Sequence, residues 1–222
     1  MGMAGPLPEE LAKTLARKLR DDQLVLFAGA GLSMQAVARD GSGVRMPGWD
    51  ALLAGVAGRF GLDLAHYKMD RLTMLDMAER KQGRETLNEA VREIIGDDAF
   101  VPGEAHVALN DLPWAAVCTT NYDTLLDRCL SSAPAVTEDD FRKQMRLPRA
   151  ERCNLFKLHG SIDNPHTLTA GDYRRWPDRH PAAHHFVKDL LVKNTLSVCR
   201  ILVERSALEG VARSGGDAGR GG

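Results

Sequence analysis

Residues 24–31 most constrain the fold of this chain, because a short apolar run passes directly into a glycine-containing turn. The run Leu24–Ala28 is uniformly apolar and lies between Asp21-Asp22 and Gly29. Such a run is typical of a strand that is buried on both faces of a parallel sheet. Glycine directly after the strand permits a tight turn and lets a phosphate approach the backbone. We therefore predict a strand, a ligand-binding turn and a helix that opens over residues 32–37.

The rest of the chain alternates between predicted strands and helices. The predicted strands are residues 114–119, 154–158 and 196–203, and the predicted helices are residues 11–19, 69–79, 85–95, 124–130 and 185–193, with one more starting at residue 49. No strand is expected between residues 49 and 108. This order predicts an α/β fold, a Rossmann-like doubly wound parallel sheet with an inserted helical subdomain at about residues 48–108.

Composition excludes several classes of function. The formal net charge of the 222 residues is -1, so the chain as a whole gives no electrostatic reason to expect nucleic-acid or membrane binding. Its apolar runs fall far short of the ~20 residues that span a bilayer, and the N-terminus lacks the apolar core of a signal peptide. We therefore expect a cytoplasmic protein.

The cysteines predict no metal site. Cys118, Cys129, Cys153 and Cys199 include no pair in a CxxC arrangement. In a cytosolic protein such residues are expected to be reduced thiols, so neither a zinc ribbon nor any other bound metal is predicted.

The first candidate ligand-binding motif runs from Phe27 to Ser33. Its glycines could bring the backbone close to a phosphate, and the hydroxyl of Ser33 could add a donor. It is not the GxGxxG dinucleotide fingerprint, because the third glycine is missing, and no Gly-Lys-Ser/Thr of a P-loop follows. A tight turn without a ligand remains an alternative. The candidate nucleotide-binding residues of this motif are Gly29, Ala30, Gly31 and Ser33.

The second motif, residues 119–123, follows the predicted strand 114–119. Thr120, Asn121 and Asp123 lie where ligands bind in open α/β sheets, at the carboxyl end of a strand. An amide could orient a sugar hydroxyl or a water, and a carboxylate could accept from a carboxamide. The structural alternatives are an Asx turn at Asn121 and a helix N-cap at Asp123.

The third motif, residues 157–161, also ends a predicted strand. His159 is followed by Gly160, and we expect it to face a cleft and to titrate near neutral pH. It is therefore the candidate general base. A purely structural histidine is the alternative reading, and the other six histidines have no comparable placement.

These three motifs, in this order, resemble the SIR2 superfamily, and its bacterial SIR2-like branch more than its zinc-bearing deacylases. Pro47-Gly48-Trp49 with Leu52-Leu53, and the segment from Leu168 to Tyr173, are similar to the same branch. The likeness extends over about residues 23–193, and we predict one SIR2-like NAD-binding domain over residues 1–205.

The resemblance implies a role for each matching residue. Gly29, Ala30, Gly31 and Ser33 match the loop that holds the NAD phosphates, and Thr120 belongs to the motif beside them. Asn121 matches the asparagine beside the nicotinamide ribose, Asp123 the aspartate that contacts the carboxamide, and His159 the catalytic histidine. Asn121 and His159 are thus the expected catalytic residues, with NAD as the substrate.

The resemblance favours an NAD glycohydrolase that forms nicotinamide and ADP-ribose, of the kind that acts in bacterial antiviral defence. The alternatives are an NAD-dependent protein deacylase, and a non-catalytic NAD- or ADP-ribose-binding or truncated homologue. No sensor domain is recognisable, so a defence-system partner could supply that function. The apolar helices of residues 48–96 could form an interface in a homo-oligomer or pack against the core.

The C-terminal end departs from the family pattern. SIR2-like proteins usually continue from this region into a strand and a Gly-Tyr-Ser-type loop, whereas here Ser197-Val198-Cys199-Arg200 leads into a glycine-rich tail. A frameshift or a truncated gene would give such a change. The tail at residues 206–222 has no hydrophobic period and is predicted to be disordered.

Overall fold

A parallel sheet forms the centre of the protein. The computed structural model describes residues 8–67, 70–130, 133–148 and 151–199. Its four-stranded sheet has the order β5-β4-β1-β8, from the strands β1 (Leu24–Ala28), β4 (Ala116–Thr119), β5 (Leu155–Lys157) and β8 (Thr195–Cys199). All of these strands pair in parallel. The chain steps outward from β1 to β5 and then returns to the other side of β1, which is a doubly wound order.

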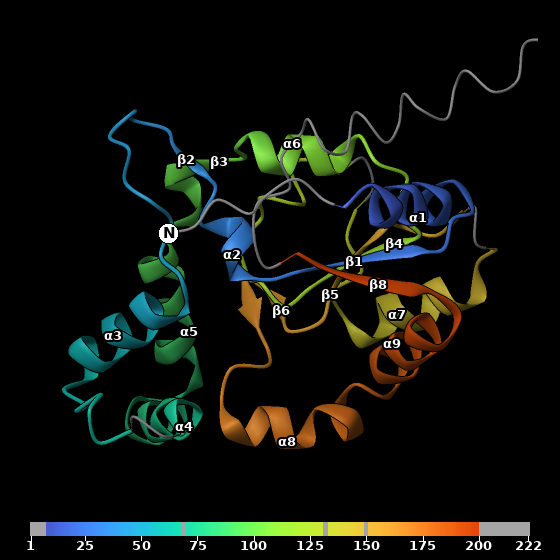
Figure 1. The fold of residues 1–222 in the computed structure, drawn as a ribbon. Coiled ribbons are helices and arrows are strands. Elements are labelled where there is room, and N and C mark those ends of the chain that lie inside the picture. Colours follow the sequence, from blue (N-terminus) through green and yellow to red (C-terminus); the bar gives the residue numbers. More distant parts are fainter. Residues whose placement is uncertain (1–7, 68–69, 131–132, 149–150, 200–222) are drawn as a thin grey trace, which may run out of the picture.

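Helices cover both faces of this sheet (Figure 1). The helices α1 (Glu9–Arg20) and α6 (Glu104–Asn110) lie on one face, and α7 (Glu138–Arg146) and α9 (Pro181–Lys193) lie on the other. Successive strand residues point to opposite faces, so each strand contributes to two cores. One core packs Leu26, Val117 and Leu155 with Leu109 of α6. The other packs Val25 and Phe156 with Phe141 and Phe186, and the rings of Phe156 and Phe186 have centroids 4.2 Å apart.

Three helices form a separate insertion beyond the carboxyl ends of the strands (Figure 1). They are α3 (Trp49–Phe60), α4 (Arg71–Gln82) and α5 (Arg84–Ile95). The carboxylate of Asp70 caps α4 by accepting from the backbone N–H of Thr73. Left-handed glycines, Gly61 and Gly96, end α3 and α5. The three helices pack around fully buried residues that include Leu53, Met74, Leu75, Leu87 and Val91.

Short elements connect these parts. They are α2 (Ala30–Ser33), β2 (Val37–Ala38), the 3-10 helix η1 (Asp97–Ala99), β3 (Phe100–Val101), β6 (Gly160–Ser161), β7 (Asn164–Pro165) and α8 (Ala170–Arg179). Antiparallel pairing joins β2 to β3 and β6 to β7. The first pair ties the chain after α2 to the end of the insertion, and the second lies directly after His159.

The predicted α/β class and the doubly wound parallel sheet are confirmed, but three local predictions are wrong. Residues 124–130 form turns and not a helix, because their backbone bonds are mixed: Arg128 donates four residues back to Thr124, whereas Cys129 donates only three residues back, to Leu126. The guanidinium of Arg128 donates to the carbonyl oxygen of Phe100 (2.7 Å) and pairs with Asp97 (3.1 Å), which ties this segment to the end of the insertion. The helix expected at residues 32–37 already ends at Ser33, and Val37 pairs with Val101 in a strand. A strand, β3, therefore exists between residues 49 and 108.

Other expectations have different outcomes. The strand predicted at residues 196–203 begins at Thr195 and is described to Cys199, while residues 200–203 and the tail lie outside the described residues. Cys118, Cys129 and Cys153 are free cysteines. Within the described part of the chain, no helix combines the length and apolar character needed to cross a membrane.

Candidate functional site

A cavity of about 190 Å³ opens where the first two motifs meet. Ala30 and Ser33 of α2 line it, together with Thr120, Asn121 and Asp123 after β4, and all of these except Ala30 have polar side chains. Because β1 and β4 are adjacent and parallel, with Ala28 opposite Thr119, their carboxyl ends bring these two loops to one edge of the sheet. Typical pockets for a whole small ligand measure about 300–1,000 Å³. The cavity is therefore of a size for part of a dinucleotide.

A chain of hydrogen bonds joins the first two motifs inside this cavity. The side-chain amide of Asn121 donates to Oγ of Ser33 over 2.8 Å, and this hydroxyl donates to Oδ2 of Asp123 over 2.6 Å. The backbone N–H of Asn121 donates to Oγ1 of Thr119, and Thr119 in turn donates to the carbonyl oxygen of Ala28. These contacts fix the orientation of the Asn121 amide, so that Oδ1 remains the polar atom with which it can accept a bond from a ligand.

The carboxylate of Asp123 is buried at the base of this chain. Burial raises its pKa above the ordinary value, while the hydrogen bond from Ser33 and the charge of Lys157 act in the opposite direction. Its other oxygen, Oδ1, accepts from the backbone N–H of Leu125 over 3.2 Å. Asp123 thus makes the kind of local backbone contact expected of a cap, although no helix follows it, and also closes the Ser33–Asn121 chain.

Lys157 holds the turn that carries Asn121 and Asp123. Its side chain is fully buried, and its ammonium donates to the carbonyl oxygens of Tyr122 (3.2 Å) and Asp123 (2.6 Å). It also pairs with Asp127 at 3.0 Å. The three protons of the ammonium match these three partners. Lys157 belongs to the third motif, but no role was predicted for it from the sequence. A lysine inside the apolar run of β5 was the available signal, because a buried charge needs partners.

The glycine turn leaves space beside β1. A Cβ atom added to Gly29 would meet no atom within 4 Å, and its φ of -113° is open to any residue. The protein fold alone therefore does not require glycine at this position, whereas a ligand close to the backbone would. The helix after it, α2, has only four residues, so its dipole is weaker than that of the longer helix expected from the sequence.

His159 lies at the same sheet edge but is not among the residues that line the cavity. Thr119 is paired with Lys157 at the end of the β4–β5 ladder. Asn121 comes two residues after Thr119 and His159 two residues after Lys157, so the two loops leave the sheet at the same level. Burial is the main cause that lowers the pKa of His159 to about 4, and the charges of the nearby His166 and His180 act in the same direction. The imidazole is thus neutral at pH 7, and the expected titration near neutral pH is wrong, because the ring is half-buried beside two other imidazoles.

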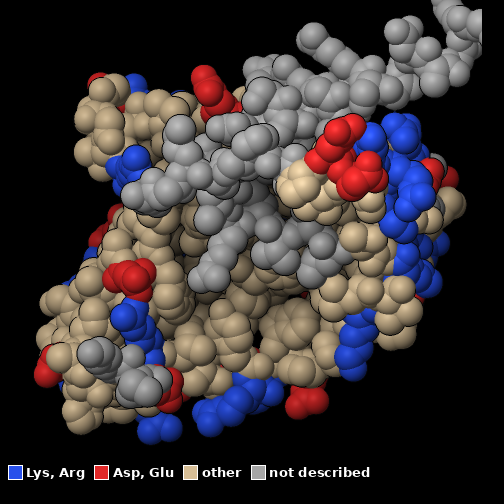
Figure 2. Space-filling model, viewed as in Figure 1, with Lys and Arg blue, Asp and Glu red and all other residues tan. Residues whose placement is uncertain are grey.

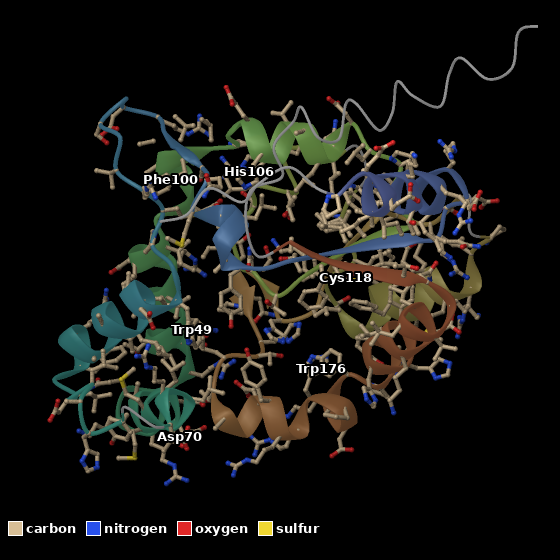
Figure 3. The ribbon with its side chains drawn as sticks, in the orientation of Figure 1. Trp49, Asp70, Phe100, His106, Cys118 and Trp176 are labelled. Atoms are coloured by element: carbon tan, nitrogen blue, oxygen red, sulfur yellow. The ribbon has the colours of Figure 1, made fainter. Side chains whose placement is uncertain are left out.

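The apolar wall of the cavity comes from both ends of the insertion and from the segment that leads into it. It consists of Met46, Pro47 and Gly48 before α3, Trp49 and Leu52 of α3, Ile95 at the end of α5, and Tyr122 after β4. Figure 3 shows Trp49 at the start of α3, the end of that helix nearest the core. Figure 2 shows mainly uncharged side chains between the insertion and the core on the visible face, with Lys and Arg gathered at its right-hand and lower margins. This wall suits a flat aromatic ring better than a phosphate.

The structure thus brings together five of the predicted residues, while the others are only near them. Ala30, Ser33, Thr120, Asn121 and Asp123 share one cavity, and Gly29 and Gly31 are the neighbours of Ala30 in the chain. Among the described residues, no group of three or more His, Cys, Asp or Glu side chains could hold a metal ion. No role was predicted from the sequence for Lys157, for Tyr173 beside His159, or for the apolar wall of the cavity.

Known proteins resemble this chain in sequence. It is 26% identical over 176 residues to the NAD(+) hydrolase ThsA of Bacillus cereus (strain MSX-D12), a match that covers 77% of this chain and 35% of the relative. It is 27% identical over 175 residues to the protein of the same name from Enterococcus faecium, covering 76% and 34%. The chain therefore matches about a third of the length of these relatives. The family model for the SIR2-like domain matches residues 115–199, which include Asn121, His159 and all of β4, β5 and β8. The chain therefore contains a SIR2-like domain.

Proposed function

We propose that this chain binds NAD and hydrolyses its nicotinamide–ribose bond, releasing nicotinamide and ADP-ribose. The observation that carries the proposal is the hydrogen-bonded chain Asn121–Ser33–Asp123 in a cavity with one polar and one apolar wall. The names of the relatives, NAD(+) hydrolases, support the same reaction.

Each wall suits one part of the substrate. The apolar side with Trp49 fits the nicotinamide ring, and Asn121 and Asp123 offer acceptor oxygens to ribose hydroxyls and to the carboxamide. The phosphates would pass the open backbone at Gly29, Ala30 and Gly31. A cavity of this size holds the nicotinamide–ribose part and leaves the adenosine part outside.

The reaction breaks the C1′–N bond and forms a C1′–O bond. The bonding electrons leave with neutral nicotinamide, and positive charge develops on the ribose as the bond lengthens. A water oriented by Oδ1 of Asn121 attacks C1′ and passes a proton to neutral His159. A pKa near 4 makes His159 a weak base, but it keeps the ring unprotonated at pH 7, and water becomes more acidic as it bonds to C1′.

The test is incubation of the purified protein with NAD, followed by measurement of nicotinamide and ADP-ribose. We expect Asn121→Ala and His159→Ala each to lower the rate of nicotinamide release by about 10² or more, the usual range for loss of acid–base catalysis. Asn110→Ala and His185→Ala make matched controls, because both residues are exposed, on α6 and α9. Circular dichroism should show that all four variants are folded.

Three outcomes would decide against this proposal. Release that depends on an acetyl-lysine peptide would identify a deacylase. NAD binding by calorimetry without turnover would identify a binding module. Full activity of either site variant would remove the role assigned to that residue.

The wider biological role is also a proposal. We propose a function in bacterial antiviral defence inside the cytoplasm, as the resemblance to the bacterial SIR2-like branch implies, with a sensor supplied by another protein or by another part of a longer chain. Infection of cells that carry the gene with and without Asn121→Ala, followed by measurement of cellular NAD, tests this role. Loss of NAD with the wild-type gene alone is the expected result.

A further inference from the structure

A tyrosine contacts the candidate general base on the ring nitrogen Nδ1. The hydroxyl oxygen of Tyr173 lies 3.3 Å from Nδ1 of His159, at the long end of hydrogen-bond distance. The two rings meet edge to face, with centroids 4.9 Å apart and an interplanar angle of 81°. Both the distance and the ring packing therefore define one orientation of the imidazole. In this orientation Nδ1 faces Tyr173, and Nε2 is the nitrogen that Tyr173 does not contact.

The helix that carries Tyr173 is attached to the end of β5 at a second point. Trp176, three residues further along α8, donates from Nε1 to the carbonyl oxygen of Leu158 over 3.0 Å. Residues three apart on a helix lie on the same face, so Tyr173 and Trp176 contact neighbouring residues of the strand end. Figure 3 shows Trp176 on the side of α8 that faces the sheet core.

The first turn of α8 is also held firmly. The carboxylate of Asp172 is buried and accepts from the backbone N–H of Thr169, in a capping box. It pairs with Arg84 of α5 at 2.6 Å and with Arg179 at 3.2 Å. Tyr173 follows Asp172 directly, so its backbone is fixed by contacts that do not involve His159.

We propose that Tyr173 is a positioning residue for His159, and that its hydroxyl oxygen accepts a hydrogen bond from Nδ1–H. This contact selects the tautomer in which Nε2 is unprotonated and free to take a proton from water. The role rests on the proposed hydrolysis, in which His159 is the base. A tyrosine hydroxyl can accept a hydrogen bond as well as donate one. An acceptor at Nδ1 keeps the proton of a neutral histidine on that nitrogen and leaves Nε2 unprotonated.

The direct test reads the tautomer by nitrogen NMR of protein labelled with ¹⁵N-histidine at pH 7. His159→Gln identifies the signals of His159. We expect protonated Nδ1 and unprotonated Nε2 in the wild-type protein, and a shift toward protonated Nε2 in Tyr173→Phe. The phenylalanine keeps the ring contact and removes only the hydroxyl. Tyr67→Phe, the same change in the insertion, should leave the tautomer of His159 unchanged.

Kinetics give a second readout. Tyr173→Phe should lower kcat by about three- to tenfold, the effect of one neutral hydrogen bond, and should leave KM for NAD unchanged. Tyr67→Phe should have the wild-type kcat. A merely structural tyrosine would change the folding stability without moving the tautomer.

The proposal is overturned if Nε2 of His159 is protonated in the wild-type protein, or if Tyr173→Phe leaves the tautomer populations as they were. The NMR measurement does not need turnover. An inactive wild-type protein with the expected tautomer would therefore refute the proposed hydrolysis while supporting the contact, so the two failures are distinguishable.

Discussion

Replacing Lys157 by methionine is expected to destabilise the fold and to loosen the turn between β4 and β5. Methionine fills a similar volume but carries no charge. The carboxylate of Asp127 would lose its partner, and the buried carbonyl oxygens of Tyr122 and Asp123 would lose their donor. Asp127 is 20% exposed in the native protein, so water would compensate only part of the loss.

The expected size follows from these contacts. Removing one partner of a buried ion pair costs about 3–5 kcal/mol. For a domain of this size each kcal/mol lowers the melting temperature by about 2–4 °C, so the melting temperature should fall by about 6–20 °C. Lys157 holds the backbone of Asp123, whose side chain accepts the hydrogen bond from Ser33. Because loss of this support should displace the Asp123 side chain, we also expect a higher KM for NAD in the folded fraction.

Urea unfolding followed by circular dichroism at pH 7 measures the loss. Lys193→Met is the matched control, because Lys193 is 67% exposed and pairs with Asp189 one helical turn away. That pair should contribute less than about 0.5 kcal/mol. Adding Asp127→Leu to Lys157→Met should restore part of the stability, since it removes the unpaired carboxylate. A loss below about 1 kcal/mol for Lys157→Met would refute the role assigned to the buried ammonium.

Two further predictions concern residues around the third motif. Gly160→Ala should cost about 1–3 kcal/mol, because Gly160 has a φ of 97° and its Cβ would lie 2.3 Å from the carbonyl oxygen of Asn164; Gly58→Ala, with open space around its Cβ, should not destabilise. Acid should also destabilise the protein, since burial holds the pKa of His159 and of His166 at about 4. Between about pH 6.5 and 4 the unfolded chain binds protons that the native one does not, so stability falls by up to about 3 kcal/mol per histidine. Urea titrations should already show this fall between pH 6.5 and 5, and a flat profile there would contradict the burial argument.

Local sequence patterns predicted the strands better than the segments between them. The apolar run Leu24–Ala28 is a strand over its full length, and β4 and β5 lie inside the predicted runs, because a strand buried on both faces must be apolar throughout. Residues 124–130 have helical composition, yet they form turns. The carboxylate of Asp97, 27 residues earlier, accepts hydrogen bonds from both the backbone N–H and the hydroxyl of Thr124. Contacts over such a distance leave no periodic signal in the sequence.

In the candidate site, too, the positions of the loops could be predicted from the sequence, but the contacts between them could not. Asn121 and Asp123 could be placed near Ser33, because each follows a strand and parallel strands deliver their carboxyl ends to one edge. The hydrogen bonds that join them connect residues about 90 positions apart. Lys157 and Tyr173 act through contacts that only the folded chain creates, so motif spacing gave no indication of their partners.

Helix α5 links the loops that carry the candidate catalytic residues. At its start, Arg84 donates to Asp172 and to the carbonyl oxygen of Pro165, which fixes the helix that carries Tyr173. Near its end, Arg92 donates to the carbonyl oxygen of Asp163, and Asp97, two residues after the helix, binds Thr124 in the turn after Asp123. A twelve-residue α-helix is a rod of about 18 Å. Because one rod contacts both loops, the spacing between Asn121 and His159 depends on the insertion as well as on the sheet. A change within α5 that shortens or bends it should therefore alter the site without touching any residue that lines the cavity.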